Sequence, residues 1–108
     1  MNWEEYTDTC RRTALYPDCH SGNPYELMYL SLGMVGEAGE VANKIKKYYR
    51  DGALDEEALG KELGDILWYF TRLCDTLGLN PSDLMQQNHD KLASRMERGV
   101  IKGAGDDR

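Results

Sequence analysis

The sequence predicts an all-α protein, a helical bundle of four to five helices built on an antiparallel helix hairpin. Apolar residues recur every three or four positions along nearly the whole chain of 108 residues, as they do on one face of a helix. No long stretch alternates apolar and polar residues, which is the pattern of a half-buried strand. The chain has material for one core only, so we expect a single helical domain over residues 1–98 and a glycine-rich tail over residues 99–108.

Residues that start and stop helices mark the first half of this bundle. A first helix is expected over residues 2–14, before a loop rich in helix breakers. Asn23 and Pro24 then look like the N-cap and the first residue of a long helix that reaches about residue 49. Glu26 stands three residues after the cap, where it can complete a capping box.

The second half follows the same rules. Asp51 and Gly52 supply turn chemistry after the long helix, and a third helix is expected over residues 56–77. Asn80 repeats the start signal for a fourth helix over residues 81–98. Because the connection between the second and third helices is short, we expect them to pack antiparallel as a hairpin.

Composition limits the partners and the compartment. The net charge of -6 disfavours a surface that holds duplex DNA or anionic lipid, so we expect neither a nucleic-acid nor a membrane partner. Met1 leads into polar residues rather than a signal peptide, so we expect a cytoplasmic protein. The three cysteines lack metal-site spacing, which is typical of reduced thiols.

Two pairs of carboxylates fall on faces that should meet. Glu37 and Glu40 are three residues apart on the second helix, about 60° around and about 4.5 Å along its axis. Glu62 and Asp65 repeat this spacing on the third helix. Facing carboxylates repel unless cations lie between them, and oxygen ligands without nearby histidine or cysteine favour Mg²⁺ or Mn²⁺.

An alternative is that these carboxylates are ordinary surface charges paired with lysines such as Lys44 or Lys61.

Three glycines stand beside the first pair, at Gly33, Gly36 and Gly39. Glycine weakens a helix by roughly 1 kcal/mol relative to alanine. We therefore expect these glycines to let another helix or a ligand approach closely.

The fourth helix adds a polar row along one face, made by Asn88, Lys91 and Arg95. Such a row can hold a polyphosphate, because lysine and arginine donate charge-assisted hydrogen bonds. A solvated basic edge is the alternative. Tyr69 lies on the same helix face as the second carboxylate pair and could contact a ligand, whereas Trp68 is expected to fill the core.

Taken together, these motifs resemble those of the MazG-like nucleotide pyrophosphohydrolases, which belong to the all-α NTP pyrophosphatase superfamily. The resemblance rests on G-E-A-G-E at residues 36–40, E-L-G-D at 62–65 and N-H-D-K-L-A-S-R at 88–95. It covers roughly residues 25–108, and R-R-T-A-L-Y-P near the start also looks like the group.

The resemblance implies Mg²⁺-dependent hydrolysis of a nucleoside triphosphate between its α and β phosphates, giving a nucleoside monophosphate and pyrophosphate. Mn²⁺ is a possible substitute for Mg²⁺. Carried over by position, it implies that the catalytic metal ligands are Glu37, Glu40, Glu62 and Asp65. It implies substrate contacts by Tyr69, Asn88, Lys91 and Arg95.

One position departs from the superfamily pattern. The fuller motif is E-E-x-x-E, and this chain has Gly36 in the first place, so the sequence does not identify the general base. Members of the family form homodimers or homotetramers, and the hairpin is small for a nucleotide site, so we expect oligomerisation to complete the bundle. The tail either folds over a neighbouring site or is disordered.

Two other functions fit the same residues. One is phosphoribosyl-ATP pyrophosphohydrolase, an enzyme of the same superfamily that acts on a different substrate. The other is a non-catalytic helical interaction module, whose carboxylates bind nothing or bind cations only for stability.

Overall fold

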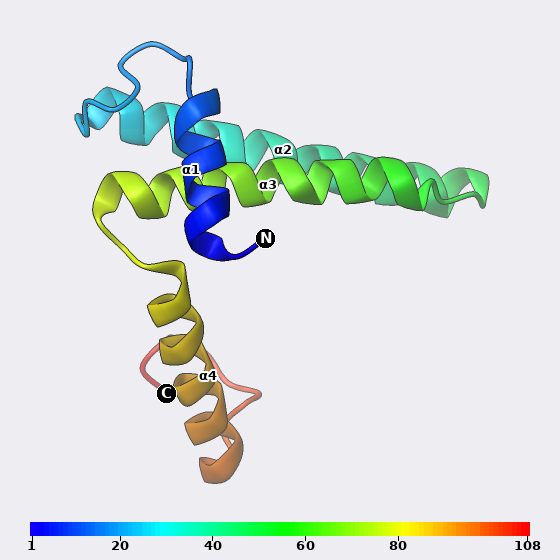
Figure 1. Ribbon diagram of the computed structural model, residues 1–108. Coiled ribbons are helices and arrows are strands. Elements are labelled where there is room, and N and C mark those ends of the chain that lie inside the picture. Colours follow the sequence, from blue (N-terminus) through cyan, green and yellow to red (C-terminus); the bar gives the residue numbers. More distant parts are fainter. The chain divides into compact units, whose positions relative to one another are not determined.

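A computed structural model describes all residues from Met1 to Arg108 (Figure 1). The protein contains four α-helices and no strands, which confirms the all-α prediction. The helices are α1 (Trp3–Thr13), α2 (Pro24–Asp51), α3 (Glu56–Leu77) and α4 (Pro81–Arg98). None of them combines the length and the apolar composition that a membrane span requires.

The predicted caps explain where these helices begin and end. The side chain of Asn23 accepts a hydrogen bond from the Glu26 amide at 3.0 Å, and Asn80 accepts one from the Ser82 amide at 2.8 Å. Each satisfies a backbone donor that the first turn leaves free. Gly52 ends α2 with φ of 80°, in the left-handed region that glycine enters without strain.

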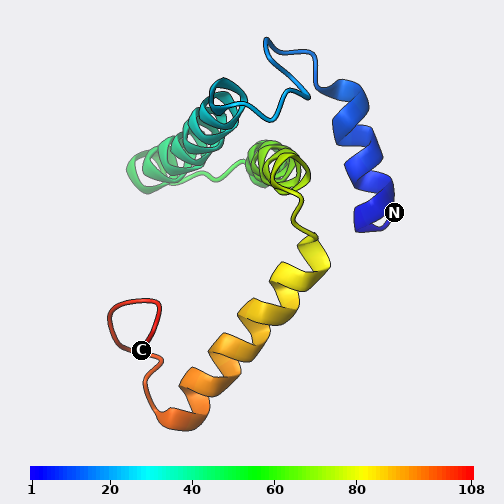
Figure 2. The same ribbon diagram turned by 90° about the vertical axis from the view of Figure 1, so that its left-hand side faces the viewer.

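The chain forms two compact units, which we call the hairpin unit (Met1–Gly78) and the C-terminal unit (Leu79–Arg108). In the hairpin unit α2 and α3 run side by side and antiparallel, as Figures 1 and 2 show. Helix α1 packs across α3, where the rings of Trp3 and Phe70 lie 6.0 Å apart. The expected helix hairpin is therefore present.

The apolar core of the hairpin unit is small. Ala14, Tyr16 and Leu30 are buried together, so the loop before α2 closes over the junction of α2 and α3. Partly buried side chains surround them, namely Cys19, Trp68, Tyr69 and Leu73. The three cysteines are free thiols in the structure.

A buried ion pair connects this core to the loop. Glu26 and Arg72 are 0% and 1% exposed, and their side chains lie 3.2 Å apart. The Glu26 carboxylate also accepts hydrogen bonds from the Tyr16 hydroxyl at 2.6 Å and from the His20 and Gly22 amides, both at 2.8 Å. Every oxygen of the buried carboxylate thus has a donor, which offsets the cost of removing the charge from water.

This network corrects part of the capping prediction. In a full capping box the Glu26 carboxylate would return to the Asn23 amide. That amide instead donates to the Ser21 hydroxyl at 3.2 Å, so the second half of the predicted box is wrong. The carboxylate turns inward because leaving the buried arginine without an anion would cost more free energy than leaving the half-exposed amide without this acceptor.

One face of α2 has no cover within the hairpin unit. Met28, Leu32 and Val35 are spaced as neighbours on that face, and they are 54%, 65% and 70% exposed. Exposed apolar residues in a continuous row are typical of surfaces that meet a partner. The expected oligomer stays a prediction.

We predict that the Glu26 network makes the protein sensitive to acid. Burial disfavours ionisation of Glu26, but the hydrogen bonds from Tyr16, Gly22 and His20 and the nearby Arg72 outweigh it and lower the pKa from 4.5 to about 2. Below pH 4.5 Glu26 binds a proton in the unfolded chain, whereas in the folded protein it stays ionised until the pH approaches 2. The free energy of unfolding should therefore decrease as the pH falls from 4.5 towards 2, as measured by thermal unfolding.

The matched variant is Glu26→Gln, which should lose about 3–5 kcal/mol at neutral pH because Arg72 stays buried without its anion. Its unfolding should depend less on pH between 4.5 and 2. The exposed Glu4→Gln serves as a control and should behave like the wild type. Identical acid titrations of the wild type and Glu26→Gln would contradict this account.

Candidate metal and nucleotide site

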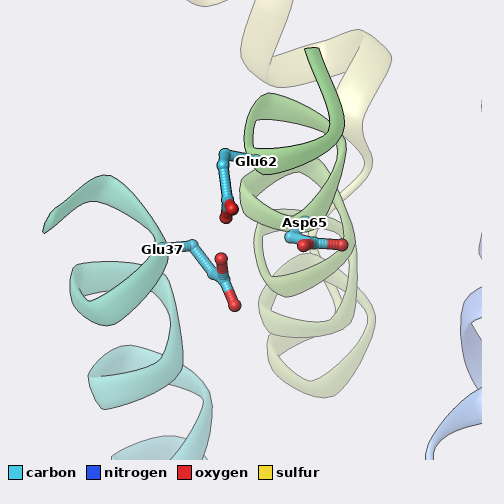
Figure 3. Close-up of side chains that lie close together, drawn as sticks. All are labelled: Glu37, Glu62 and Asp65. Carbon is cyan, nitrogen blue, oxygen red and sulfur yellow. The ribbon is translucent and has the colours of Figure 1, made fainter. Parts of the chain in front are cut away.

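Three of the four predicted carboxylates meet between α2 and α3. Glu37 extends from α2, and Glu62 and Asp65 extend from α3 (Figure 3). Each offers one oxygen, and these oxygens all lie within 4.8 Å of one another. Glu37 and Glu62 are half-buried and Asp65 is exposed, so the cluster sits at the edge of the helix interface and is open on one side.

Glu40 lies outside this cluster. It is exposed and does not bring an oxygen within the same distance. Its charge nevertheless contributes to the electrostatics of Glu37, one turn earlier on α2. The predicted four-carboxylate site is therefore a cluster of three with a fourth acidic side chain beside it.

Repulsion within the cluster alters the protonation of Glu37. A hydrogen bond with Glu62, burial, and the charges of Asp65, Glu62 and Glu40 raise the pKa of Glu37 from 4.5 to about 7. A protonated Glu37 donates to Glu62, whereas an ionised one repels it. Near neutral pH the protein without a bound cation therefore keeps a proton in the cluster for part of the time.

A single lysine approaches the cluster. The ammonium of Lys44 lies 3.8 Å from Glu62, one of the surface pairs that the alternative interpretation expects. Lys61 pairs with Glu57 at 3.9 Å instead, away from the cluster. One lysine cannot balance three carboxylates, so the cluster retains a net negative charge that suits a divalent cation.

An open pocket of about 310 Å³ adjoins the cluster and is lined by Glu37, Asp65, Trp68 and Tyr69. Tyr69 therefore lies beside the carboxylates, which is the position that the predicted substrate contact requires. Trp68 packs against the core as expected and also lines this pocket. Burial, with smaller effects of Tyr29 and Glu37, raises the pKa of the Tyr69 hydroxyl, so the hydroxyl keeps its proton.

The predicted polar row of α4 belongs to the C-terminal unit and is described within it. Asn88 is exposed, Lys91 is half-buried and Arg95 is 4% exposed. The cover over Arg95 comes from the tail, which turns back beside α4 (Figure 2). The tail is thus folded against its own helix.

Arginine and lysine of α4 hold this tail. Arg95 donates to the backbone carbonyl of Asp106 at 2.5 Å, and Lys91 lies 3.4 Å from the Asp106 carboxylate. Nε of Arg95 is buried and has no partner. The sequence analysis did not predict that Asp106 would contact Lys91 and Arg95. The two neighbouring acidic residues of the tail, Asp106 and Asp107, could have indicated this pairing with the basic residues of α4.

Comparison with known proteins identifies the family of the chain. Residues 27–100 match the family model of the MazG nucleotide pyrophosphohydrolase domain. The chain is also 43% identical over 114 residues to the "Gene 37 protein" of Mycobacterium phage L5, and the match covers the whole of both chains. No solved structure matches the chain. The matched range includes all three carboxylates of the cluster.

The cluster predicts how the metal-free protein responds to pH. Since folding raises the pKa of Glu37 from 4.5 to about 7, the folded protein holds a proton that the unfolded chain has lost. The free energy of unfolding should therefore fall as the pH rises from 4.5 through 7, as measured by thermal unfolding in a chelator.

Glu37→Gln should flatten this decline and should be more stable than the wild type at pH 8, because it removes one of the repelling charges. Glu57→Gln, an exposed change on α3, is the control and should keep the decline. A wild-type protein whose stability does not fall over this range would show that the carboxylates do not interact.

Proposed function

Because the chain belongs to the MazG nucleotide pyrophosphohydrolase family, we propose that it hydrolyses a nucleoside triphosphate, of either the ribo or the deoxyribo series. The proposed cut lies between the α and β phosphates and gives a nucleoside monophosphate and pyrophosphate. One observation supports the proposal above the others. Three carboxylates from two antiparallel helices bring their oxygens within 4.8 Å of one another beside an open pocket.

The proposed cofactor is Mg²⁺, with Mn²⁺ as a substitute. The donor set fits, because carboxylate oxygens are the ligands these ions prefer and the cluster contains no histidine or cysteine. Glu37, Glu62 and Asp65 would hold the ion, and we propose Glu40 as an additional ligand. When bound, Mg²⁺ supplies charge neutralisation of the triphosphate, polarisation of the attacked phosphorus and a lower pKa for a bound water.

The chain's own residues would bind and orient the substrate. Tyr69 lines the pocket next to the carboxylates and offers both a ring and a neutral hydroxyl. On α4 we propose Asn88 and Lys91 as contacts to phosphate oxygens. Arg95, predicted as a further substrate contact, donates to the tail. We propose that the phosphate displaces the Asp106 carboxylate from Lys91 and the tail from Arg95 when the substrate binds.

The proposed reaction consumes one water. Its oxygen forms a bond to the α phosphorus as the bond from that phosphorus to the bridging oxygen breaks. The bridging oxygen leaves with pyrophosphate, and a proton is released. Cations held by the carboxylates would also offset the repulsion between the negative triphosphate and an acidic protein.

We also propose that the protein works as a homodimer or homotetramer. The support is the uncovered apolar row of α2, formed by Met28, Leu32 and Val35. Burying such a row against a second copy would remove apolar surface from water.

We predict that the purified protein with Mg²⁺ releases pyrophosphate from at least one common nucleoside triphosphate. Asp65→Asn and Glu62→Gln should lower kcat/KM by about 100-fold or more, because each removes a charged oxygen ligand of the cluster. A panel of all common ribo and deoxyribo triphosphates, with phosphoribosyl-ATP added, measures the preference through pyrophosphate release.

Two controls make this test specific. Glu57→Gln lies on the same helix outside the cluster and should retain activity, and circular dichroism should show that all variants fold. Glu40→Gln measures the contribution of the exposed fourth acid. Unchanged activity in both cluster variants would refute the proposed site. No turnover, together with no thermal stabilisation by Mg²⁺ and a nonhydrolysable triphosphate, would favour the interaction module.

A further inference from the structure

One of the three glycines in the middle of α2 has a steric reason that the other two lack. A Cβ atom built on Gly36 or Gly39 would meet nothing within 4 Å. A Cβ atom on Gly33 would overlap Cε1 and Cζ of the Tyr69 ring. The ring of Tyr69 therefore lies directly against the backbone of α2 at Gly33, in space that any other residue would fill.

The same helix register links this contact to the carboxylate cluster. One turn along α2 leads from Gly33 to Glu37, and one turn back along α3 leads from Tyr69 to Asp65. Because the helices are antiparallel, both steps run in the same direction. The contact between Gly33 and the Tyr69 ring thus lies one helical turn from the carboxylate cluster, in the same interface of α2 and α3. The ring also lines the pocket that Glu37 and Asp65 line.

A second aromatic ring contacts Tyr69. Trp68 meets Tyr69 edge to face, with ring centroids 5.1 Å apart and planes at 87°. The Trp68 indole donates a hydrogen bond to the Thr13 hydroxyl at 2.8 Å, which anchors it to α1. Tyr69 therefore contacts both an anchored indole and the bare backbone at Gly33, and a side chain at position 33 would displace it.

We propose that Gly33 is a positioning residue for the nucleotide site, because it leaves the space in which Tyr69 forms one wall of the pocket beside Glu37 and Asp65. This inference rests on the proposed function. Gly33 itself touches no substrate and acts only through the Tyr69 ring. A methyl group at position 33 moves the ring out of its place, and the substrate loses that wall.

The test compares alanine substitutions at two helical glycines of the hairpin unit. Gly33→Ala should raise KM about 10-fold or more with a smaller change in kcat, because a displaced contact weakens substrate binding. Gly60→Ala, an exposed change on α3, gains the same helix propensity without the overlap, so its KM should stay within about twofold of the wild type.

A double variant tests whether Gly33 acts through the ring. Tyr69→Ala should raise KM by a similar factor, and adding Gly33→Ala to it should cost nothing further, since the ring that would be displaced is gone. A wild-type KM for Gly33→Ala, or effects of the two substitutions that multiply, would overturn the inference.

The contact itself is measured without turnover. In an NMR spectrum the Hα protons of Gly33 should be shifted by the Tyr69 ring current relative to those of Gly36, and Tyr69→Ala should abolish the shift. Unshifted Gly33 protons would overturn the inference even in an active enzyme. A shifted Gly33 in a protein that hydrolyses no nucleotide would refute the proposed function while leaving the contact in place.

Discussion

The structure depends on one electrostatic constraint, which is that α2 and α3 pack antiparallel with carboxylates facing each other. Glu37, Glu62 and Asp65 approach within 4.8 Å, although like charges at that distance repel. Without a cation the cost appears as the raised pKa of Glu37, since a proton takes the place of a positive charge. A hairpin that served stability alone would gain by replacing these residues with neutral ones, which is why we propose a ligand of opposite charge.

The rest of the hairpin unit keeps these carboxylates in register. Its apolar core is small, and much of the interior is occupied by the Glu26 and Arg72 ion pair with its hydrogen bonds to Tyr16 and the loop before α2. Directional bonds of this kind fix one arrangement of helices more strictly than a few apolar contacts do. Arg72 lies two turns after Asp65 on α3, so the network holds the helix that carries two of the three carboxylates of the cluster.

Sequence reasoning succeeded where the signal is local. Caps such as Asn23 and Gly52 act within one turn, and the spacing of Glu37 against Glu40 fixes their positions on a helix before any packing is known. It failed where the outcome depends on distant partners. The sequence does not reveal that Glu26 turns inward to Arg72 or that the tail covers Arg95. Nor does it reveal that, of the three glycines of α2, Gly33 is the one that the Tyr69 ring contacts. Each of these requires the three-dimensional register of two segments.

The most direct test of the account is binding of Mg²⁺ or Mn²⁺ alone, measured by calorimetry near pH 6.5 in buffers of different ionisation enthalpy. We expect saturable binding that releases a proton, because the cation displaces the proton held at Glu37. Asp65→Asn should weaken this binding about 10-fold or more, and Glu57→Gln should leave it unchanged. Absence of saturable binding to the wild type, or equal binding by Asp65→Asn, would contradict the claim that the facing carboxylates form a metal site.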